Sequence, residues 1–226
     1  MNFLSHFYFD RNNANCYHVL GTVLPDLLKN ADKSAMLHPQ KHSYPNAPTR
    51  YLYDGWMKHL EVDRHFHNSD FFKHHSHQLK LHLRPAITGS PVKPFFLGHI
   101  ALELILDNLL LTTQQISASN FYDHLQNCDD NVIREFLVIS GFKNPEVFIQ
   151  FFQRFKTDRY LHTYAQTEKV AYALKRICMR IWNNPFLPEQ EEAINQVIIN
   201  YRELLLPEFL SVFDEIDTLI KDSGSQ

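Results

Sequence analysis

Apolar residues recur along most of this chain at spacings of three and four positions, which is the period of an amphipathic helix. Alternating β-branched runs bounded by hairpin turns, the usual pattern of strands, are missing. The pattern predicts an all-α fold, and the length suits a single multihelical domain spanning residues 1–226. The expected helices cover approximately residues 13–29, 48–68, 71–83, 95–111, 117–128, 131–139, 144–155, 167–182 and 189–221.

Prolines and polar stretches set the expected breaks between these helices. Pro25 predicts a kink or an end near residue 24 of the first helix. Residues 84–94 contain three prolines and form the clearest break in the chain. Pro207 divides the last predicted helix into a pair if it acts as a breaker. Residues 222–226 are expected to form a frayed tail.

Composition narrows the class of protein further. The formal net charge of −3 gives no general attraction to nucleic acid, so no nucleic-acid scaffold is expected. The three cysteines are odd in number and widely spaced, which favours a reducing cytoplasm over a disulfide framework. The amino-terminal segment lacks the pattern of a signal peptide, and no run approaches the roughly 18 uninterrupted apolar residues of a membrane span. A soluble, cytoplasmic protein is therefore expected.

Histidines gather in the first half of the chain, and they form columns with carboxylates on two predicted helices. His59, Asp63 and His67 stand four residues apart on the helix at 48–68. A second column repeats this spacing on the helix at 95–111, and consists of His99, Glu103 and Asp107. Residues four apart project from one face of a helix. Imidazole and carboxylate together suit manganese, zinc or iron.

The second column is the stronger signal because its helix is apolar on most sides. Unpaired carboxylates buried there would cost several kcal/mol each, so a positive group must meet Glu103 and Asp107. A metal ion is one answer, and Arg176 or Arg180 from another helix is the alternative. The first column has its own alternative, a surface ion pair between residues 59 and 63. Asp26 and His6 are further candidate ligands.

Several short motifs resemble the acyl carrier protein phosphodiesterase family, a helical branch related to HD-type phosphohydrolases. Residues 1–6 (MNFLSH) are similar to its M-N-F-L-A-H start. Residues 21–29 resemble G-N-x-x-x-D-F-V-K, which implies that Asp26 is an acidic ligand. Residues 59–63 resemble H-R-x-I-D, which implies paired ligands at His59 and Asp63, and residues 164–168 resemble a late Y-x-x-x-E stretch.

The chain also departs from this family at named positions. The family's D-x-x-x-D-H corresponds here to Glu103, Asp107 and Asn108, so the final histidine is absent, and His99 is its candidate substitute. Leu60 replaces an arginine, and His67 replaces an acid. The H-x-x-x-D and H-x-x-x-E pairs, with Phe-Leu-Gly before His99, also resemble zinc-dependent phospholipase C and its nuclease relatives.

Both resemblances imply a metal-dependent phosphodiester hydrolase with an HD-like or phospholipase C-like helical fold. The first implies that the substrate is acyl carrier protein, with release of 4′-phosphopantetheine. The alternatives are a phospholipase C-like or nucleotide phosphohydrolase, and a helical binding protein that has lost its activity. The candidate catalytic residues are Asp26, Asp63, Glu103 and Asp107. The candidate metal ligands are Asp26, His59, Asp63, His99, Glu103, Asp107, His6 and His67.

Overall fold

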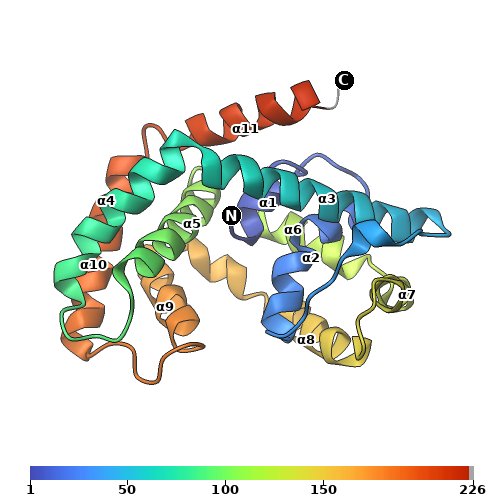
Figure 1. The fold of residues 1–226 in the computed structure, drawn as a ribbon. Coiled ribbons are helices and arrows are strands. Elements are labelled where there is room, and N and C mark those ends of the chain that lie inside the picture. Colours follow the sequence, from blue (N-terminus) through green and yellow to red (C-terminus); the bar gives the residue numbers. More distant parts are fainter. Residues whose placement is uncertain (224–226) are drawn as a thin grey trace. The chain divides into compact units, whose positions relative to one another are not determined.

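A computed structural model describes residues 1–223 of the chain (Figure 1). These described residues form eleven α-helices and two short 3₁₀ helices, and no strand is found among them. The all-α prediction is therefore confirmed. In chain order the elements are α1 (Phe3–Tyr8), α2 (Cys16–Ala31), η1 (Pro39–Lys41), α3 (Ala47–Asn68), α4 (Asp70–Ala86), α5 (Pro94–Thr112), α6 (Ala118–Gln126), α7 (Asp130–Ile139), α8 (Pro145–Asp158), η2 (Tyr160–Ala165), α9 (Thr167–Cys178), α10 (Pro188–Leu205) and α11 (Leu210–Ser223).

Every predicted helix is present. Of the two alternatives at Pro25, the helix end is not observed and the kink stays a prediction, and the break expected from residue 84 begins only after Ala86. Helix α2 continues through Pro25 to Ala31, because fully buried leucines on both sides of the proline, such as Leu24 and Leu27, pack well enough to offset the lost hydrogen bond. Helix α4 likewise includes Pro85 and ends one residue later. The short helix α1 was not predicted.

The end of the chain follows the expected pair of helices. Helix α10 ends at Leu205 and α11 begins at Leu210, so of the two alternatives, one long helix or a pair broken near Pro207, the pair is observed. The frayed tail was predicted too early, because Asp222 and Ser223 belong to α11. The rest of that tail, residues 224–226, lies outside the described residues.

The chain divides into two compact units, each built from segments that are far apart in the sequence. Unit 1 comprises Met1–Ser5, Arg64–Gln115 and the chain from Thr163 onward. Unit 2 comprises His6–Asp63 and Ile116–His162. The single domain expected over residues 1–226 stays a prediction.

Helix α5 forms the centre of unit 1. Helices α4, α9 and α10 pack against it (Figure 1). Among residues 1–223 it is the one helix long and apolar enough to cross a membrane, by length and composition alone. However, 61% of its most apolar window is buried inside the structure. This burial is what a core helix shows, and it agrees with the expectation that α5 is covered on most sides.

Unit 2 is organised around helix α2, which packs against α6 and α8. Its core is strongly aromatic: the Phe7 ring meets Phe121 edge-on with centroids 5.3 Å apart. Tyr44 stacks on Phe136 at 5.0 Å, and its hydroxyl lies 2.9 Å from the Ser140 hydroxyl. These contacts tie the loop before α3 to α7.

Candidate functional site

Two glycines allow α2 and α3 to approach closely in unit 2, and this approach positions His59. A Cβ atom on Gly21 would overlap the Leu52 carbonyl oxygen, and one on Gly55 would overlap the His18 carbonyl oxygen. Neither obstacle is a flexible side chain, so no larger residue fits without moving a helix. His59 lies one turn beyond Gly55 on α3, and therefore reaches the backbone of α2.

His59 is buried, with a side chain only 4% exposed. Its Nδ1 atom lies 2.9 Å from the carbonyl oxygen of Thr22 on α2. Because a carbonyl oxygen can only accept, Nδ1 donates the proton, and Nε2 carries the lone pair of the neutral ring. A backbone carbonyl that orients the ring in this way is typical of metal-ligating histidines. The interpretation of residues 59 and 63 as a surface ion pair is not what the structure shows.

His6 on α1 is also buried, and its ring stacks on His59 with centroids 4.0 Å apart. Neither of its ring nitrogens makes a hydrogen bond, and Nε2 lies 3.3 Å from Oδ1 of Asp63. Burial, aided by the nearby His59, lowers the pKa of His6 to about 4. The ring is therefore neutral near pH 7 and keeps a lone pair that can bind a cation.

Asp63 completes this group from one turn beyond His59 on α3. Its side chain is 31% exposed, and its Oδ2 atom lies 3.7 Å from Nε2 of His59. Burial raises the pKa of the Asp63 carboxyl, but the facing His6 and His59 outweigh burial and hold that pKa well below its usual range. One ligand atom from each of the three residues lies within 4.8 Å of the others, and we call them the His6–His59–Asp63 group.

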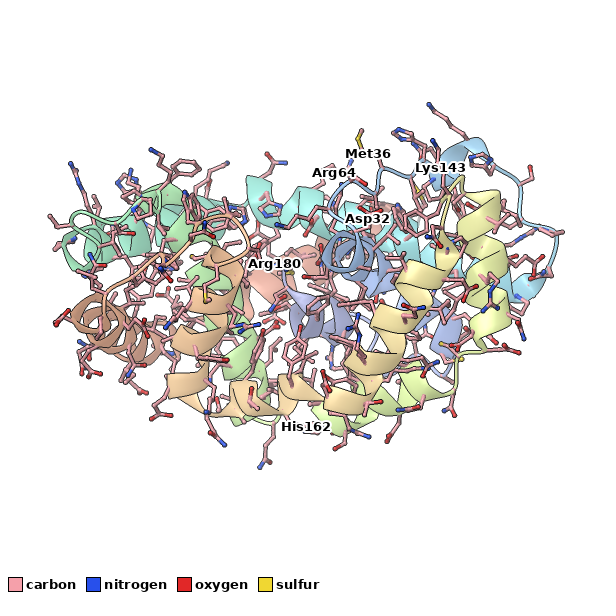
Figure 2. All side chains as sticks on the ribbon, turned by 90° about the horizontal axis from the view of Figure 1, so that it is seen from below. Asp32, Met36, Arg64, Lys143, His162 and Arg180 are labelled. Carbon is pink, nitrogen blue, oxygen red and sulfur yellow. The ribbon has the colours of Figure 1, made fainter. Side chains whose placement is uncertain are left out.

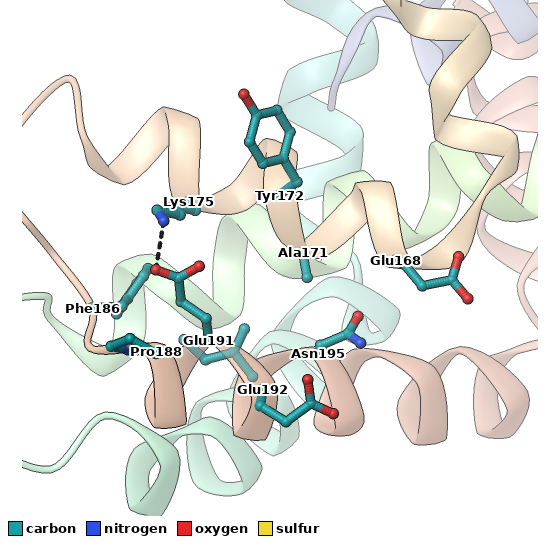
Figure 3. Close-up of a pocket in the computed structure, with 10 residues that line it drawn as sticks. Glu168, Ala171, Tyr172, Lys175, Phe186, Pro188, Glu191, Glu192 and Asn195 are labelled. Carbon is teal, nitrogen blue, oxygen red and sulfur yellow. Dashed lines mark hydrogen bonds and ion pairs between the residues drawn. The ribbon is translucent and has the colours of Figure 1, made fainter.

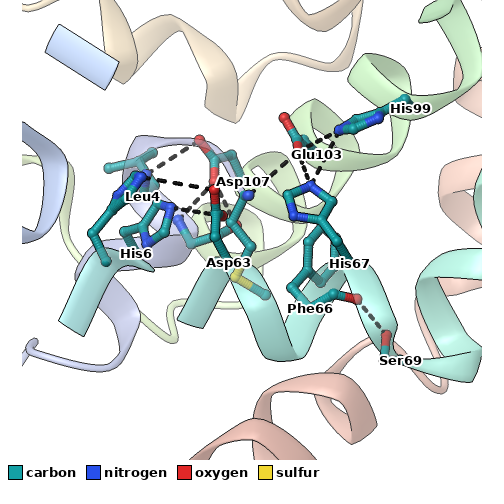
Figure 4. A network of polar contacts seen from close by, with 12 residues as sticks. Leu4, His6, Asp63, Phe66, His67, Ser69, His99, Glu103 and Asp107 are labelled. Atoms are coloured by element: carbon teal, nitrogen blue, oxygen red, sulfur yellow. Dashed lines mark hydrogen bonds and ion pairs between the residues drawn. The ribbon is translucent and has the colours of Figure 1, made fainter. Parts of the chain in front are cut away.

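A second group of the same composition lies in unit 1, and Figure 4 shows its three side chains converging. His67 comes from the last turn of α3, and His99 and Glu103 come from α5. His99 Nε2 lies 3.0 Å from Glu103 Oε1 and 3.3 Å from His67 Nε2. The remaining side of the triangle, from His67 Nε2 to Glu103 Oε1, is 3.5 Å. The α-amino group of Met1 lies 3.3 Å from the same carboxylate oxygen.

Asp107 belongs to neither group. Its carboxylate accepts hydrogen bonds from the Ser5 backbone N–H at 2.8 Å, the Ser5 hydroxyl at 2.7 Å and the Leu4 N–H at 3.3 Å (Figure 4). Two of these three donors are backbone N–H groups in the first turn of α1, where helical partners are lacking. Burial raises the pKa of Asp107 to about 7 against the hydrogen bonds, and Glu103 adds to the rise. Asp107, which was predicted to be a metal ligand, therefore holds the first turn of α1 through these hydrogen bonds.

Asn108 shows what has replaced the histidine of the resembled family. Its Nδ2 donates to the Tyr164 carbonyl oxygen at 2.6 Å, and its Oδ1 accepts from Arg202 Nε at 2.9 Å. The side chain is fully buried. It therefore links α5 to α10 and to η2 within unit 1 rather than facing either ligand group.

Six of the eight candidate ligands thus lie in two groups of three, each inside one unit. Asp26, on α2 beside Pro25, is half-buried and is not a member of either group. The expected single centre built from residues 59, 63, 99, 103 and 107 stays a prediction, since each of the two groups is defined within one unit. His6 and His67, the weakest candidates in the sequence, each complete a group.

The alternative partners named for the acidic pair are not found. No guanidinium lies within ion-pair distance of Glu103 or Asp107 in the part of the chain that the structure describes. Arg176 is exposed on α9, and Arg180 is exposed in the turn that follows (Figure 2). Glu103 instead meets the two imidazoles and the Met1 amine.

A separate cavity of about 310 Å³ lies between α9 and α10 in unit 1 (Figure 3). Lys175 on α9 forms an ion pair with Glu191 on α10 at its edge. Glu168 and Glu192 also line it, together with apolar residues such as Phe186 and Ile194. None of the predicted site residues lines this cavity, and it holds no imidazole.

No family model, no curated protein and no solved structure matches this chain. The resemblances to acyl carrier protein phosphodiesterases and to phospholipase C therefore remain expectations from short motifs. Two ligand groups that could each hold a metal ion are the strongest functional feature of the described residues.

Proposed function

We propose that this protein is a metal-dependent phosphodiester hydrolase whose metal ion is bound by His6, His59 and Asp63. The observation that carries the proposal is a pair of buried, stacked imidazoles beside one partly exposed carboxylate. Three protein ligands leave at least one coordination position for water or substrate, as in catalytic zinc sites. The partial exposure of Asp63 provides a solvent-facing side.

The donor chemistry supports a metal ion at this position. A buried nitrogen without a hydrogen bond is costly; His6 Nδ1 has no polar partner, and Nε2 has only the Asp63 carboxylate at 3.3 Å. A cation near Asp63 would satisfy one of these nitrogens, while the Thr22 carbonyl keeps the lone pair of His59 on Nε2. Two imidazoles and a carboxylate suit zinc, manganese or iron.

The chemistry proposed for the chain's own residues is limited to their contacts. When bound, a divalent ion would acidify a water molecule and neutralise charge on the phosphoryl oxygens. Both oxygens of Asp63 face imidazoles, at 3.3 Å and 3.7 Å, so we assign Asp63 to ligation and orientation rather than to proton transfer. Burial of His6 and His59 excludes water from the inner side of the site.

The substrate that the motifs favour is acyl carrier protein, cleaved at its phosphopantetheine link. This substrate is consistent with a cytoplasmic location, as are three cysteines that are free in the structure. A phosphocholine ester and a cyclic nucleotide represent the alternative substrate classes. If one of these is hydrolysed and the carrier protein is not, the proposed substrate is wrong and the proposed reaction class, phosphodiester hydrolysis, is retained.

The test combines metal content with turnover. Freshly purified protein should contain zinc, manganese or iron, and should hydrolyse one of the three esters when the matching ion is added. Asp63→Asn should lower metal affinity by at least roughly 100-fold, because even residues that only support ligands contribute 10–100-fold. His65→Asn, two positions away on α3 and outside both groups, is the matched control. Turnover by metal-free protein, or unchanged turnover in Asp63→Asn, would refute the proposal.

A catalytically lapsed binding protein is the competing function, and Asn108 is the observation that favours it. This residue replaces a family histidine and is engaged in structural hydrogen bonds. Stoichiometric metal binding without hydrolysis of any of the three esters would support this second reading.

A further inference from the structure

A second set of donors converges in unit 1 with no part in the function proposed above. His67 Nε2, His99 Nε2 and Glu103 Oε1 form a triangle with sides of 3.0, 3.3 and 3.5 Å (Figure 4). Ligands at 2.0–2.2 Å from a tetrahedral ion are separated by about 3.3–3.6 Å. The triangle therefore has nearly the size of one face of such a coordination sphere.

From this geometry we propose that His67, His99 and Glu103 form a second metal site, specific for a borderline divalent cation such as Zn²⁺. The donor set combines two imidazoles with one carboxylate, which zinc accepts and the harder Ca²⁺ and Mg²⁺ disfavour. The site is separate in its residues from the His6–His59–Asp63 group. If this second site does not bind a metal ion, the proposed hydrolase activity at the first group is unaffected.

Each pair among these three atoms can form a hydrogen bond only where one of its nitrogens carries a proton. His99 Nε2 lies within hydrogen-bond distance of both His67 Nε2 and Glu103 Oε1. A proton on His99 Nε2 can be donated to the Glu103 carboxylate. A second proton, on His67 Nε2, would then point at the His99 proton, because the two nitrogens are 3.3 Å apart. The α-amino group of Met1 also meets Glu103 Oε1, and it is the one competing cation at this carboxylate among the described residues. A metal ion satisfies all three lone pairs at once.

Neighbouring residues hold the two imidazoles in place. The Phe72 ring meets His67 and His99 edge-on, with centroids 4.9 Å from each. The Ser69 hydroxyl donates to the Phe66 carbonyl at the end of α3 and accepts from the Phe72 N–H at the start of α4. This hydroxyl fixes the junction between the two helices, and so the position of both His67 and Phe72.

Gly98 sets the position of His99. A Cβ atom on Gly98 would lie 2.7 Å from both the Lys80 nitrogen and the Ser76 carbonyl oxygen of α4. The glycine therefore lets α5 lie against the α4 backbone directly beside the ligand. His99 is 38% exposed and His67 33%, so a cation can enter from solvent.

The site would join the end of α3 to the centre of α5. Binding should therefore stabilise unit 1, because an ion that binds the folded chain and not the unfolded chain raises stability by mass action. The role we assign to the ion is structural, because its ligands would connect the last turn of α3 to α5.

The test titrates Zn²⁺ into the chelator-treated full chain carrying Asp63→Ala, which removes a ligand from the first group. This protein should bind one Zn²⁺ and show a higher melting temperature when saturated. Adding His99→Asn should abolish both effects, whereas His77→Asn, an exposed histidine on α4 outside both groups, should not. Co²⁺ should give a visible absorption spectrum that is lost with His99→Asn.

The single variants keep the test decisive if Asp63→Ala does not fold, as judged by circular dichroism. In that case the wild type should bind two Zn²⁺ and His99→Asn one. The proposal is overturned if Asp63→Ala folds and binds no Zn²⁺, or if His99→Asn leaves the stoichiometry and the melting shift unchanged.

Discussion

A buried imidazole can bind a metal ion through one nitrogen when the other nitrogen is held by a different partner. His59 meets this condition, because its Nδ1–H donates a hydrogen bond to the Thr22 carbonyl oxygen. His6 has no partner on Nδ1, and its Nε2 faces only the Asp63 carboxylate, at 3.3 Å. The two histidines of one group therefore differ: a backbone carbonyl holds Nδ1 of His59, whereas no group holds Nδ1 of His6.

Asp107 provides a prediction of pH dependence. Its pKa is about 7 in the folded chain, against an ordinary value of 3.8. Between these values the folded state holds a proton that the unfolded state has released. The free energy of unfolding should therefore decline as pH rises from about 4 through 7, by at most about 4 kcal/mol from this group.

Urea unfolding of chelator-treated protein at several pH values from 5 to 8 measures this decline. Asp107→Asn should be less stable than the wild type at pH 5, because Leu4 loses an acceptor, and its stability should lack the pH-dependent part that Asp107 contributes. Parallel curves for the two proteins over this range would show that Asp107 is already ionised in the folded state.

The same residue shows where sequence reasoning stops. Spacing along α5 correctly placed Asp107 in line with His99 and Glu103, and burial of an acid was correctly expected. Its hydrogen-bond partners, Leu4 and Ser5, lie more than a hundred residues away in the sequence, so no local sequence pattern identifies them as partners. His6 was underrated for a related reason, since the short helix that carries it has too few turns to show a period.

Helix packing decides whether the ligands of the first group can meet. Gly21 and Gly55 let α2 and α3 touch through their backbones, and the hydrogen bond from His59 to Thr22 depends on that closeness. The helices themselves were predictable from periodicity. Their contact was not predictable. A glycine inside a helix can either simply lower helix stability or allow another backbone to approach closely, and the sequence does not distinguish these two cases.

Gly55→Ala tests this contact. The added Cβ atom would overlap the His18 carbonyl oxygen, so α2 and α3 must move apart. We expect a loss of about 1–3 kcal/mol in the free energy of unfolding and weaker metal binding at the His6–His59–Asp63 group. Denaturant unfolding and metal titration measure the two effects.

Gly89→Ala is the matched control for that substitution. Gly89 has a φ of +84° and open space around its Cα atom, so alanine there adds backbone strain of about 1 kcal/mol without a steric clash. Metal binding should be unchanged in this variant. Equal metal affinity in both variants would mean that the helix contact does not position His59.

Each compact unit gathers segments from distant parts of the chain, and each ligand group ties such segments together. In unit 2 the ligands come from α1 and α3, and in unit 1 they come from α3 and α5. Closing a loop between distant segments restricts the unfolded chain, so a bound ion acts on the stability of the fold as well as on chemistry.

Hydrogen exchange should make this stabilisation visible. Zn²⁺ at a hundredfold excess over the dissociation constant adds about 2.7 kcal/mol for each site. Amide exchange in α3 and α5 should slow most, whereas local opening of α8, which carries no candidate ligand, should change least. Exchange that is unchanged in α3 and α5 on adding Zn²⁺ would argue against metal binding at either group.

The unequal burial of the two groups affects how quickly each would release a bound metal ion during purification. His6 and His59 are buried, and Asp63 is the one partly exposed member of their group, whereas every member of the other group is partly exposed. An ion bound by the His6–His59–Asp63 group would dissociate slowly and be retained during dialysis. An ion bound by His67, His99 and Glu103 would dissociate quickly and be lost on washing. Metal that remains after long dialysis would thus report the lifetime of an enclosed ion more than its affinity.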